Sequence, residues 1–168
     1  MVIKKLFLCI SMLLLTSFIS TSLAAEALIF EKLPQAQKSK QWAVHVGEAE
    51  KEKDLVKPIK GKFVTYSLKI DKIGNDVDSV KVHLYRNEPN SKTKYSLVSC
   101  PNSVPCSREN DEWAIALAKQ MNDGKPYLFR NFLLAEKATE LEVEVVWTEG
   151  GQGRSLKETF TFTEESKE

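Results

Sequence analysis

Residues 140–148 read ELEVEVVWT and residues 155–163 read SLKETFTFT, with the glycine-rich stretch GGQGR at 150–154 between them. Apolar and polar side chains alternate in both segments, which is the pattern of a strand with one buried face. The apolar members of the two rows are Leu141, Val143, Val145, Trp147, Leu156, Phe160 and Phe162. A glycine-rich turn between two such segments predicts an antiparallel β-hairpin.

The same alternation recurs upstream of this hairpin. Apolar side chains occupy every second position in residues 41–47 (QWAVHVG), 62–70 (KFVTYSLKI) and 79–86 (SVKVHLYR). Residues 127–134 (YLFRNFLL) are apolar on both faces and predict a strand that is covered on both sides. A further short strand is expected within 94–99, and turn-forming Asn, Gly and Pro residues separate most of these segments.

Residues 111–121 (DEWAIALAKQM) carry two competing patterns. Asn110 can cap a helix whose first turn holds two acidic residues, and the alanines that follow are good helix formers. Trp113, Ile115 and Leu117 also alternate, so a strand is the alternative. We favour a short helix.

These elements together predict a mainly β protein. Short strands separated by turns are typical of an antiparallel β-sandwich, here with one short helix. The architecture resembles immunoglobulin-like and fibronectin-like domains. The resemblance is limited to architecture, because the two mature cysteines are too close in sequence to join two sheets as the immunoglobulin pair does.

The first 24 residues are typical of a secretory signal peptide. Two lysines precede an apolar run from Leu6 to Ile19, and small residues follow it. Cleavage is expected after Ala24, Ala25 or Ala27. The run is shorter than the roughly 20 residues of a membrane-spanning helix, so we expect no membrane span after cleavage.

The remaining chain is expected to hold one domain, because 168 residues give room for little more. We place an N-terminal extension at residues 25–40 and a single β-sandwich domain at 41–165. Lys and Arg total 24 against 23 Asp and Glu, a net charge of +1. This near-balance argues against nucleic acid as a partner, since binding it requires a clustered basic surface.

Cys100 and Cys106 are the cysteines that remain once the signal peptide is removed. An even pair in an exported chain predicts a disulfide bond. The spacing matches neither a thiol oxidoreductase motif nor a zinc site. By the chain-entropy formula, closing so small a loop stabilises the fold by about 2–2.5 kcal/mol.

This stapled loop is the candidate partner-binding surface. A rigid loop loses little entropy when it binds, which favours Asn102, Ser103 and Val104 as contact residues. Arg154 in the glycine-rich turn is a weaker candidate for contact with an anionic partner. Trp113 is expected in the core, and becomes a candidate anchor if it is exposed beside the loop.

Catalytic and metal-binding signatures are sparse in this sequence. The mature chain has two histidines, His45 and His83, on two predicted strands and opposite the apolar rows. If those strands lay side by side, the histidines would converge with Glu48 on a metal. Neither a metalloprotease motif nor a hydrolase nucleophile elbow is present, so we expect no cofactor, no metal and no catalytic residue.

These observations lead to four hypotheses on function. The favoured one is an exported, non-enzymatic binding domain that contacts a protein or cell-envelope component. The alternatives are a secreted protease inhibitor that uses the stapled loop, a hydrolase that uses His45 or His83, and a structural envelope component. The expected location is extracellular, with the periplasm or the envelope as the alternative.

Overall fold

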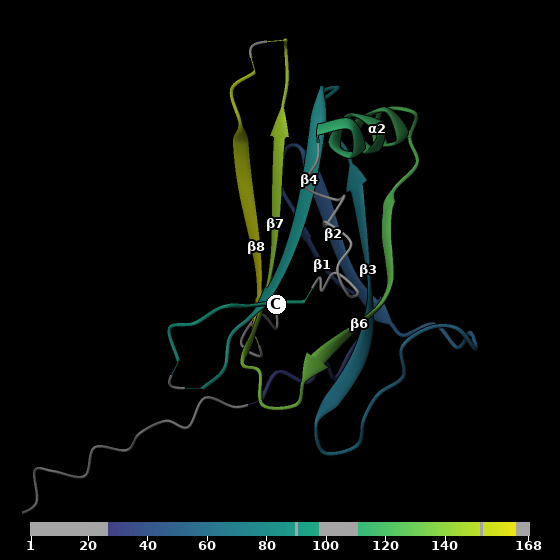
Figure 1. Cartoon of the computed structure of the whole chain (residues 1–168), viewed down its shortest axis with the longest axis vertical. Helices are drawn as coiled ribbons and strands as arrows, with labels where there is room; N and C mark the ends of the chain where they lie inside the picture. Colours follow the sequence, from purple (N-terminus) through teal and green to yellow (C-terminus); the bar gives the residue numbers. More distant parts are fainter. Residues whose placement is uncertain (1–26, 90, 98–110, 152, 164–168) are drawn as a thin grey trace, which may run out of the picture.

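The computed structural model of the chain describes residues 27–89, 91–97, 111–151 and 153–163. Within these ranges the protein is mainly β, with two four-stranded antiparallel sheets and one helix (Figure 1). Sheet A has the strand order β1 (Gln35–Lys38), β2 (Trp42–Glu48), β3 (Phe63–Lys72) and β6 (Tyr127–Ala135). Sheet B has the order β5 (Tyr95–Ser96), β4 (Ser79–Arg86), β7 (Glu140–Thr148) and β8 (Leu156–Thr163).

This architecture confirms the mainly β class with two antiparallel sheets that the sequence predicts. The hairpin of β7 and β8 has the expected register, with Trp147 opposite Leu156 and Glu140 opposite Thr163. Its turn contains glycines with positive φ, such as Gly150 at 69°, a conformation that residues with a Cβ rarely adopt. The finer likeness to immunoglobulin or fibronectin domains stays a prediction.

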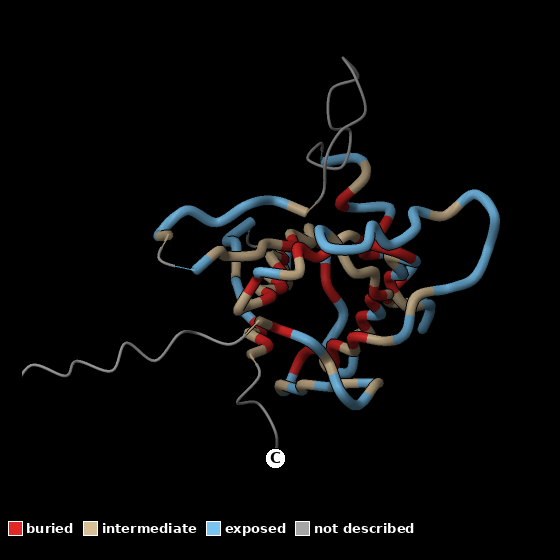
Figure 2. The backbone as a smooth tube through the Cα atoms, turned by 90° about the horizontal axis from the view of Figure 1, so that it is seen from below, coloured by how far each residue is buried: buried red, intermediate tan, exposed pale blue. Residues whose placement is uncertain are grey.

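The hydrophobic core lies between the inner faces of the two sheets (Figure 2). Trp42 of sheet A meets Trp147 of sheet B edge to face, with ring centroids 5.6 Å apart. The largest side chains that are fully buried include Trp42, Phe132, Phe162, Leu68, Ile70, Leu84, Leu134 and Leu141. They come from both sheets and occupy alternate positions of their strands, so the period-two pattern positions the core.

The two ends of the sandwich differ. At one end, β4 and β6 terminate while β3 and β7 begin; we call it the mouth end, and it is the lower end in Figure 1. At the other, the hairpin end, lie the β7–β8 turn and helix α2 (Asp111–Asn122). This division decides which predicted site residues lie near one another.

Helix α2 confirms the helical alternative for residues 111–121. Its apolar residues Ala114, Leu117, Ala118 and Met121 recur at helical spacing and are buried. The helix packs mainly against β4. Within sheet B, β4 lies between the long strand β7 and the strand β5, which is only two residues long. Asn122, its last residue, donates to the Val77 carbonyl (3.0 Å) and accepts from the Val77 amide (3.2 Å), which fixes the helix to the turn before β4.

The N-terminal segment departs from the sequence expectation. Residues 25–40 were expected to lie outside the domain, yet β1 pairs with β2 and Leu28 is 1% exposed. The Leu28 amide donates to the Ala138 carbonyl (2.6 Å), and the Phe30 ring meets Tyr66 edge to face at 4.9 Å. The folded unit therefore begins upstream of residue 41.

Strand β6 also differs in part from its prediction. It was expected to be covered on both faces, but it forms an edge of sheet A and Leu128 on its outer side is 56% exposed.

None of the helices in the described part of the chain has the length and apolar character needed to cross a bilayer.

Candidate functional site

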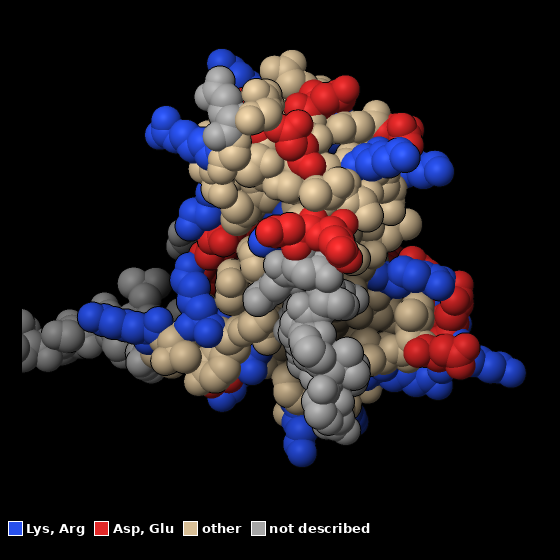
Figure 3. All heavy atoms as spheres, turned by 45° about the horizontal axis from the view of Figure 1, so that its top comes forward, with Lys and Arg blue, Asp and Glu red and all other residues tan. Residues whose placement is uncertain are grey.

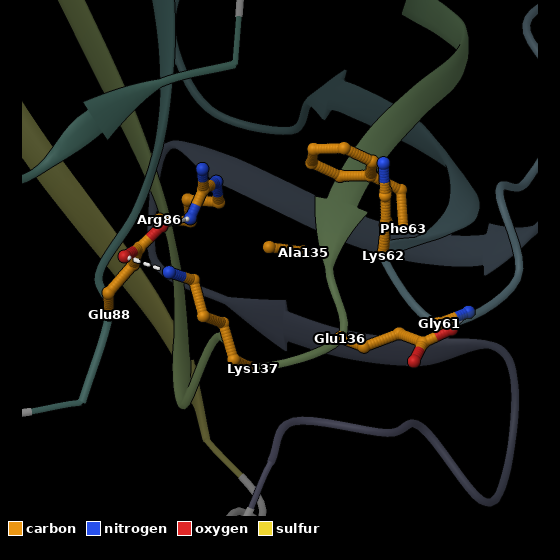
Figure 4. A pocket seen from close by; sticks show the side chains of 8 residues that line it. All are labelled: Gly61, Lys62, Phe63, Arg86, Glu88, Ala135, Glu136 and Lys137. Atoms are coloured by element: carbon orange, nitrogen blue, oxygen red, sulfur yellow. Dashed lines mark hydrogen bonds and ion pairs between the residues drawn. The ribbon is translucent and has the colours of Figure 1, made fainter.

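A pocket opens at the mouth end of the sandwich, with a volume of about 570 Å³ (Figure 4). The residues that line it are Gly61, Lys62, Phe63, Arg86, Glu88, Ala135, Glu136 and Lys137. They come from the start of β3, the end of β4, the end of β6 and the segments next to them. We call this the mouth pocket. Its volume lies in the range of roughly 300–1,000 Å³ of small-molecule sites.

Arg86 is the central cation of the mouth pocket. The inward row of β4 runs through Val80, Val82 and Leu84, and the same alternation places Arg86 on the inner face at the last position of the strand. Its side chain is only 13% exposed. The guanidinium lies over the ring of Tyr95, 4.8 Å from the centroid, in a cation–π contact with the neighbouring strand β5.

Glu88 bridges two cations on one wall of the mouth pocket. Arg86 Nη1 lies 2.6 Å from Glu88 Oε1, and Lys137 Nζ lies 2.5 Å from Glu88 Oε2, so each carboxylate oxygen has its own cation (Figure 4). Hydrogen bonds from Lys137 and then from Arg86 hold the pKa of the Glu88 carboxyl below its usual value of 4.5. Glu88 is therefore ionised at neutral pH.

The opposite wall of the mouth pocket is held by the start of β3. The Gly61 amide donates to Glu136 Oε1 (2.9 Å), and the Glu136 amide donates to the Lys62 carbonyl (3.0 Å). Gly61 has φ of 76°, which a residue with a Cβ rarely adopts. Figure 4 shows Glu136 turned toward Gly61, away from the Glu88 cluster. This wall is fixed independently of the ion pairs opposite it.

The chemistry of the mouth pocket favours a ligand with an anionic group. Lys62, Arg86 and Lys137 outnumber the two carboxylates, and the Glu136 carboxylate is occupied by a backbone amide. Phe63 and Ala135 add an apolar wall. A planar guanidinium with one face on an aromatic ring presents its hydrogen-bond donors in a fixed geometry, which suits a carboxylate or phosphate oxygen.

The sequence-predicted partner residues lie elsewhere. Trp113 is partly buried, packs against the core and meets Tyr127 edge to face at 6.4 Å, as its default prediction required. Arg154 is exposed in the β7–β8 turn. Both lie toward the hairpin end, away from the mouth pocket (Figure 1). Figure 3 shows acidic and basic side chains interspersed on the face around this end.

The stapled-loop prediction falls outside the described residues. It concerns Cys100, Cys106 and the contact residues Asn102, Ser103 and Val104, all within 98–110. The disulfide bond therefore stays a prediction, and so does the role of this loop in binding.

The two histidines do not come together. His45 lies on the outer face of sheet A, where its Nε2 is 3.5 Å from Asp71 Oδ2. His83 lies on the outer face of sheet B and stacks on Tyr85, with ring centroids 6.2 Å apart. The convergence that a metal site would need does not occur, because β2 and β4 belong to different sheets. Among the described residues, no group of three or more His, Cys, Asp and Glu side chains is placed to hold a metal.

Sequence reasoning missed Arg86, Glu88 and Lys137. One signal was available, because the alternation of β4 continues one step beyond Leu84 and places a charged residue in an inward row. Such a position needs a partner for the charge, and Glu88 follows two residues later. The contribution of Lys137 required knowledge that the β6–β7 turn meets the end of β4.

Comparison with known proteins places this chain in a family. It is 47% identical over 142 residues to a Bacillus subtilis (strain 168) protein, the uncharacterized protein YozF, with 84% of this chain and 85% of the relative aligned. No solved structure matches the chain. A family model described as "YozF-like secreted protein" matches residues 26–168. This description confirms the secreted location expected from the signal pattern, and the chain belongs to the YozF-like secreted protein family.

Proposed function

We propose that this protein is a secreted, non-enzymatic binding module that takes a small anionic group in the mouth pocket. The single observation that carries the proposal is the placement of Arg86. An arginine on the inner face of a strand, 13% exposed at the rim of a pocket of about 570 Å³, is held in position before any ligand arrives. Preorganisation of this kind lowers the entropy cost of binding.

The setting of Arg86 also strengthens its interactions. Hydrogen bonds to charged groups contribute about 1.5–3 kcal/mol each, more than neutral ones. A guanidinium that is largely withdrawn from water is less screened than an exposed lysine. These properties favour an anionic ligand over a neutral one of the same shape.

A binding role without catalysis fits the residues that line the mouth pocket. The eight lining residues include no histidine, cysteine, serine or threonine, so no hydroxyl, thiol or imidazole nucleophile lines the pocket. Of the amines and carboxylates, Lys137 and Glu88 pair with each other and Glu136 accepts the Gly61 amide. His45 and His83, the residues of the hydrolase alternative, lie on the outer faces of different sheets. The proposed role therefore rests on binding alone.

The proposed partner is a small molecule, or an anionic group carried by a protein or an envelope polymer. The inhibitor alternative depends on the loop of Cys100 and Cys106, and no described contact bears on it. The disulfide, the contact role of that loop and the immunoglobulin-like or fibronectin-like architecture remain proposals beside the mouth pocket.

The test measures the melting temperature of the protein purified from culture medium, with and without small anions. The probes are acetate, succinate, hexanoate and inorganic phosphate, with hexan-1-ol as the neutral match for hexanoate. A ligand at about 100 times its Kd adds about 2.7 kcal/mol to the free energy of unfolding, which raises the melting temperature.

The matched variants are Arg86→Gln in the mouth pocket and Lys125→Gln in the turn after α2. We expect at least one anion to raise the melting temperature of the wild type and of Lys125→Gln, and not that of Arg86→Gln. The proposal is overturned if no anion has an effect, or if the effect is equal in all three proteins.

A further inference from the structure

Resting on the proposed function, we infer that the ligand of the mouth pocket is a small organic carboxylate, and that Glu88 occupies its place until the ligand displaces it. The Glu88 carboxylate is thus the same chemical group as the one that the ligand presents to the cations.

The Glu88 carboxylate is bound as a carboxylate ligand would be. Its two oxygens are divided between two cations, with Arg86 Nη1 at 2.6 Å and Lys137 Nζ at 2.5 Å. These cations come from different parts of the fold, the end of β4 and the β6–β7 turn, and the carboxylate joins them on one side of the pocket (Figure 4). A carboxylate on a free molecule offers the same two oxygens in the same plane.

Arg86 does not depend on Glu88 for its position. Its backbone is fixed by the register of β4 with Leu141 of β7 and with Tyr95 of β5. Its guanidinium lies over the Tyr95 ring. When Glu88 is displaced, the Arg86 guanidinium therefore stays in position to bind the ligand.

The backbone of Glu88 is anchored independently of its ion pairs, because the Ser91 amide donates to the Glu88 carbonyl (3.1 Å) and the preceding residue is fixed as well. Asn87 is held by Thr139, whose amide and hydroxyl both donate to the Asn87 side-chain oxygen at 3.1 and 3.0 Å. After Glu88 the chain is largely exposed from Pro89 to Ser96 among the described residues. A rotation of the Glu88 side chain alone releases the carboxylate and leaves both β4 and its partner β5 in place.

The rest of the mouth pocket favours a carboxylate that carries a short apolar part. Phe63 and Ala135 form the apolar wall, and Lys62 lies at the exposed rim. Inorganic phosphate would engage the cations and leave that wall empty. A medium-chain acid such as hexanoate can contact both the cations and the apolar wall, so hexanoate is the appropriate probe.

The experiment is a titration of the secreted, ¹⁵N-labelled protein with hexanoate, followed by the NMR signals of the Gly61 and Glu136 amides. Hexan-1-ol and inorganic phosphate are titrated in parallel. The proteins are the wild type, Glu88→Gln, Lys137→Gln, the double variant, and Lys125→Gln as the control for loss of one exposed lysine.

A displaceable Glu88 gives a distinctive pattern. Removing its charge frees the site, so Glu88→Gln binds hexanoate about tenfold more tightly if the open state is about one tenth of the wild type. Lys137→Gln weakens the binding of both the Glu88 carboxylate and hexanoate. When Glu88 is present, this change therefore has only a small effect on the Kd for hexanoate. In the Glu88→Gln background the same change weakens binding by about two- to fivefold, because only the ligand loses a partner.

Each other outcome has a definite meaning. If hexanoate binds and Lys137→Gln has the same effect in both backgrounds, Glu88 does not compete and the displacement is wrong, while the binding site stands. If phosphate binds and hexanoate does not, the carboxylate assignment is wrong and the anion-binding function stands. If no probe moves the Gly61 and Glu136 signals in the wild type or in Glu88→Gln, both proposals fail.

Discussion

Asn131 and Glu50 exchange two hydrogen bonds although 81 positions separate them in the sequence. The Glu50 amide donates to Asn131 Oδ1 (2.9 Å), and Asn131 Nδ2 donates to the Glu50 carbonyl (3.1 Å). The same Nδ2 donates to the Val56 carbonyl at 3.1 Å. One side-chain amide on β6 therefore fixes both ends of the segment 50–56, which crosses from β2 to the edge of sheet A.

A β-bulge gives Asn131 this role. Tyr66 pairs with Phe132 and Leu68 with Phe129, so Ser67 alone faces both Arg130 and Asn131. The extra residue disrupts the ladder locally and re-aims the side chains next to it. The neighbouring Arg130 donates hydrogen bonds to the carboxylates of Glu50 and Glu52. Both contacts raise the pKa of its guanidinium, that with Glu50 most.

Replacement of Asn131 by Ala is expected to lower the free energy of unfolding by about 1–3 kcal/mol, because it removes three hydrogen bonds made by a side chain that is only 8% exposed. Urea unfolding measures the loss, and hydrogen exchange should rise in residues 50–56. The control is Asn75→Ala, since that side chain is exposed and the hydrogen bonds at Asn75 use its backbone. Equal losses in the two variants would show that the amide of Asn131 does not hold the segment.

The sequence predicted those elements whose stability comes from an alternating apolar row. The hairpin of β7 and β8 and the strands β2, β3 and β4 follow this rule, and α2 was predicted from its Asn110 cap and helix-forming residues. Strand β1 escaped prediction because QAQK has no apolar row. It is held by pairing with β2 and by Gln37 Nε2, which donates to the Thr161 carbonyl of β8 (2.7 Å).

The mouth pocket was less accessible to prediction than the strands. It is formed where three separate strand ends meet, and sequence patterns carry no information on which ends become neighbours. The bulge at Arg130 and Asn131 is a similar case, because nothing in YLFRNFLL marks the inserted residue. A charged residue at a strand end is predicted to be exposed to solvent unless its partner elsewhere in the fold is known.

The N-terminal segment offers a direct test of where the folded unit begins. Leu28 is 1% exposed and its neighbour Ile29 is 55% exposed, so the two positions form a matched pair. We expect Leu28→Ala to lower the free energy of unfolding by about 2–5 kcal/mol through lost burial and a residual cavity. Ile29→Ala should change it by about 0.5 kcal/mol or less. If chemical denaturation gives two similar small values, the segment is not part of the cooperative unit.

The cysteine pair can be tested without further structural information. We expect Cys100 and Cys106 of the secreted protein to resist alkylation by iodoacetamide until a reductant is added. Reduction should then lower the free energy of unfolding by about 2–2.5 kcal/mol, as the loop-entropy formula gives for so short a loop. The double variant Cys100→Ser, Cys106→Ser should be insensitive to reductant. Alkylation of both thiols in the untreated protein would rule the disulfide out.

The ion pairs of Glu88 make the stability of the protein depend on pH in a defined direction. The pKa of Glu88 is lower in the folded protein than its usual value of 4.5, so the unfolded chain binds the proton more readily. The contribution of Glu88 to stability is therefore fully present above pH 4.5 and is lost as the pH falls through the lowered pKa.

Replacement of Glu88 by Gln should accordingly lower the free energy of unfolding at neutral pH. The difference from the wild type should shrink below pH 4.5 and disappear once the wild-type carboxyl is protonated, because both proteins are then uncharged at this position. Glu48→Gln is the control: that residue is exposed at the end of β2, and its side chain makes no salt bridge among the described residues. Urea unfolding at a series of pH values measures both variants. A Glu88→Gln difference that stays constant into the acid range would mean that Arg86 and Lys137 do not stabilise the ionised form, and the resident-carboxylate inference would lose its electrostatic basis.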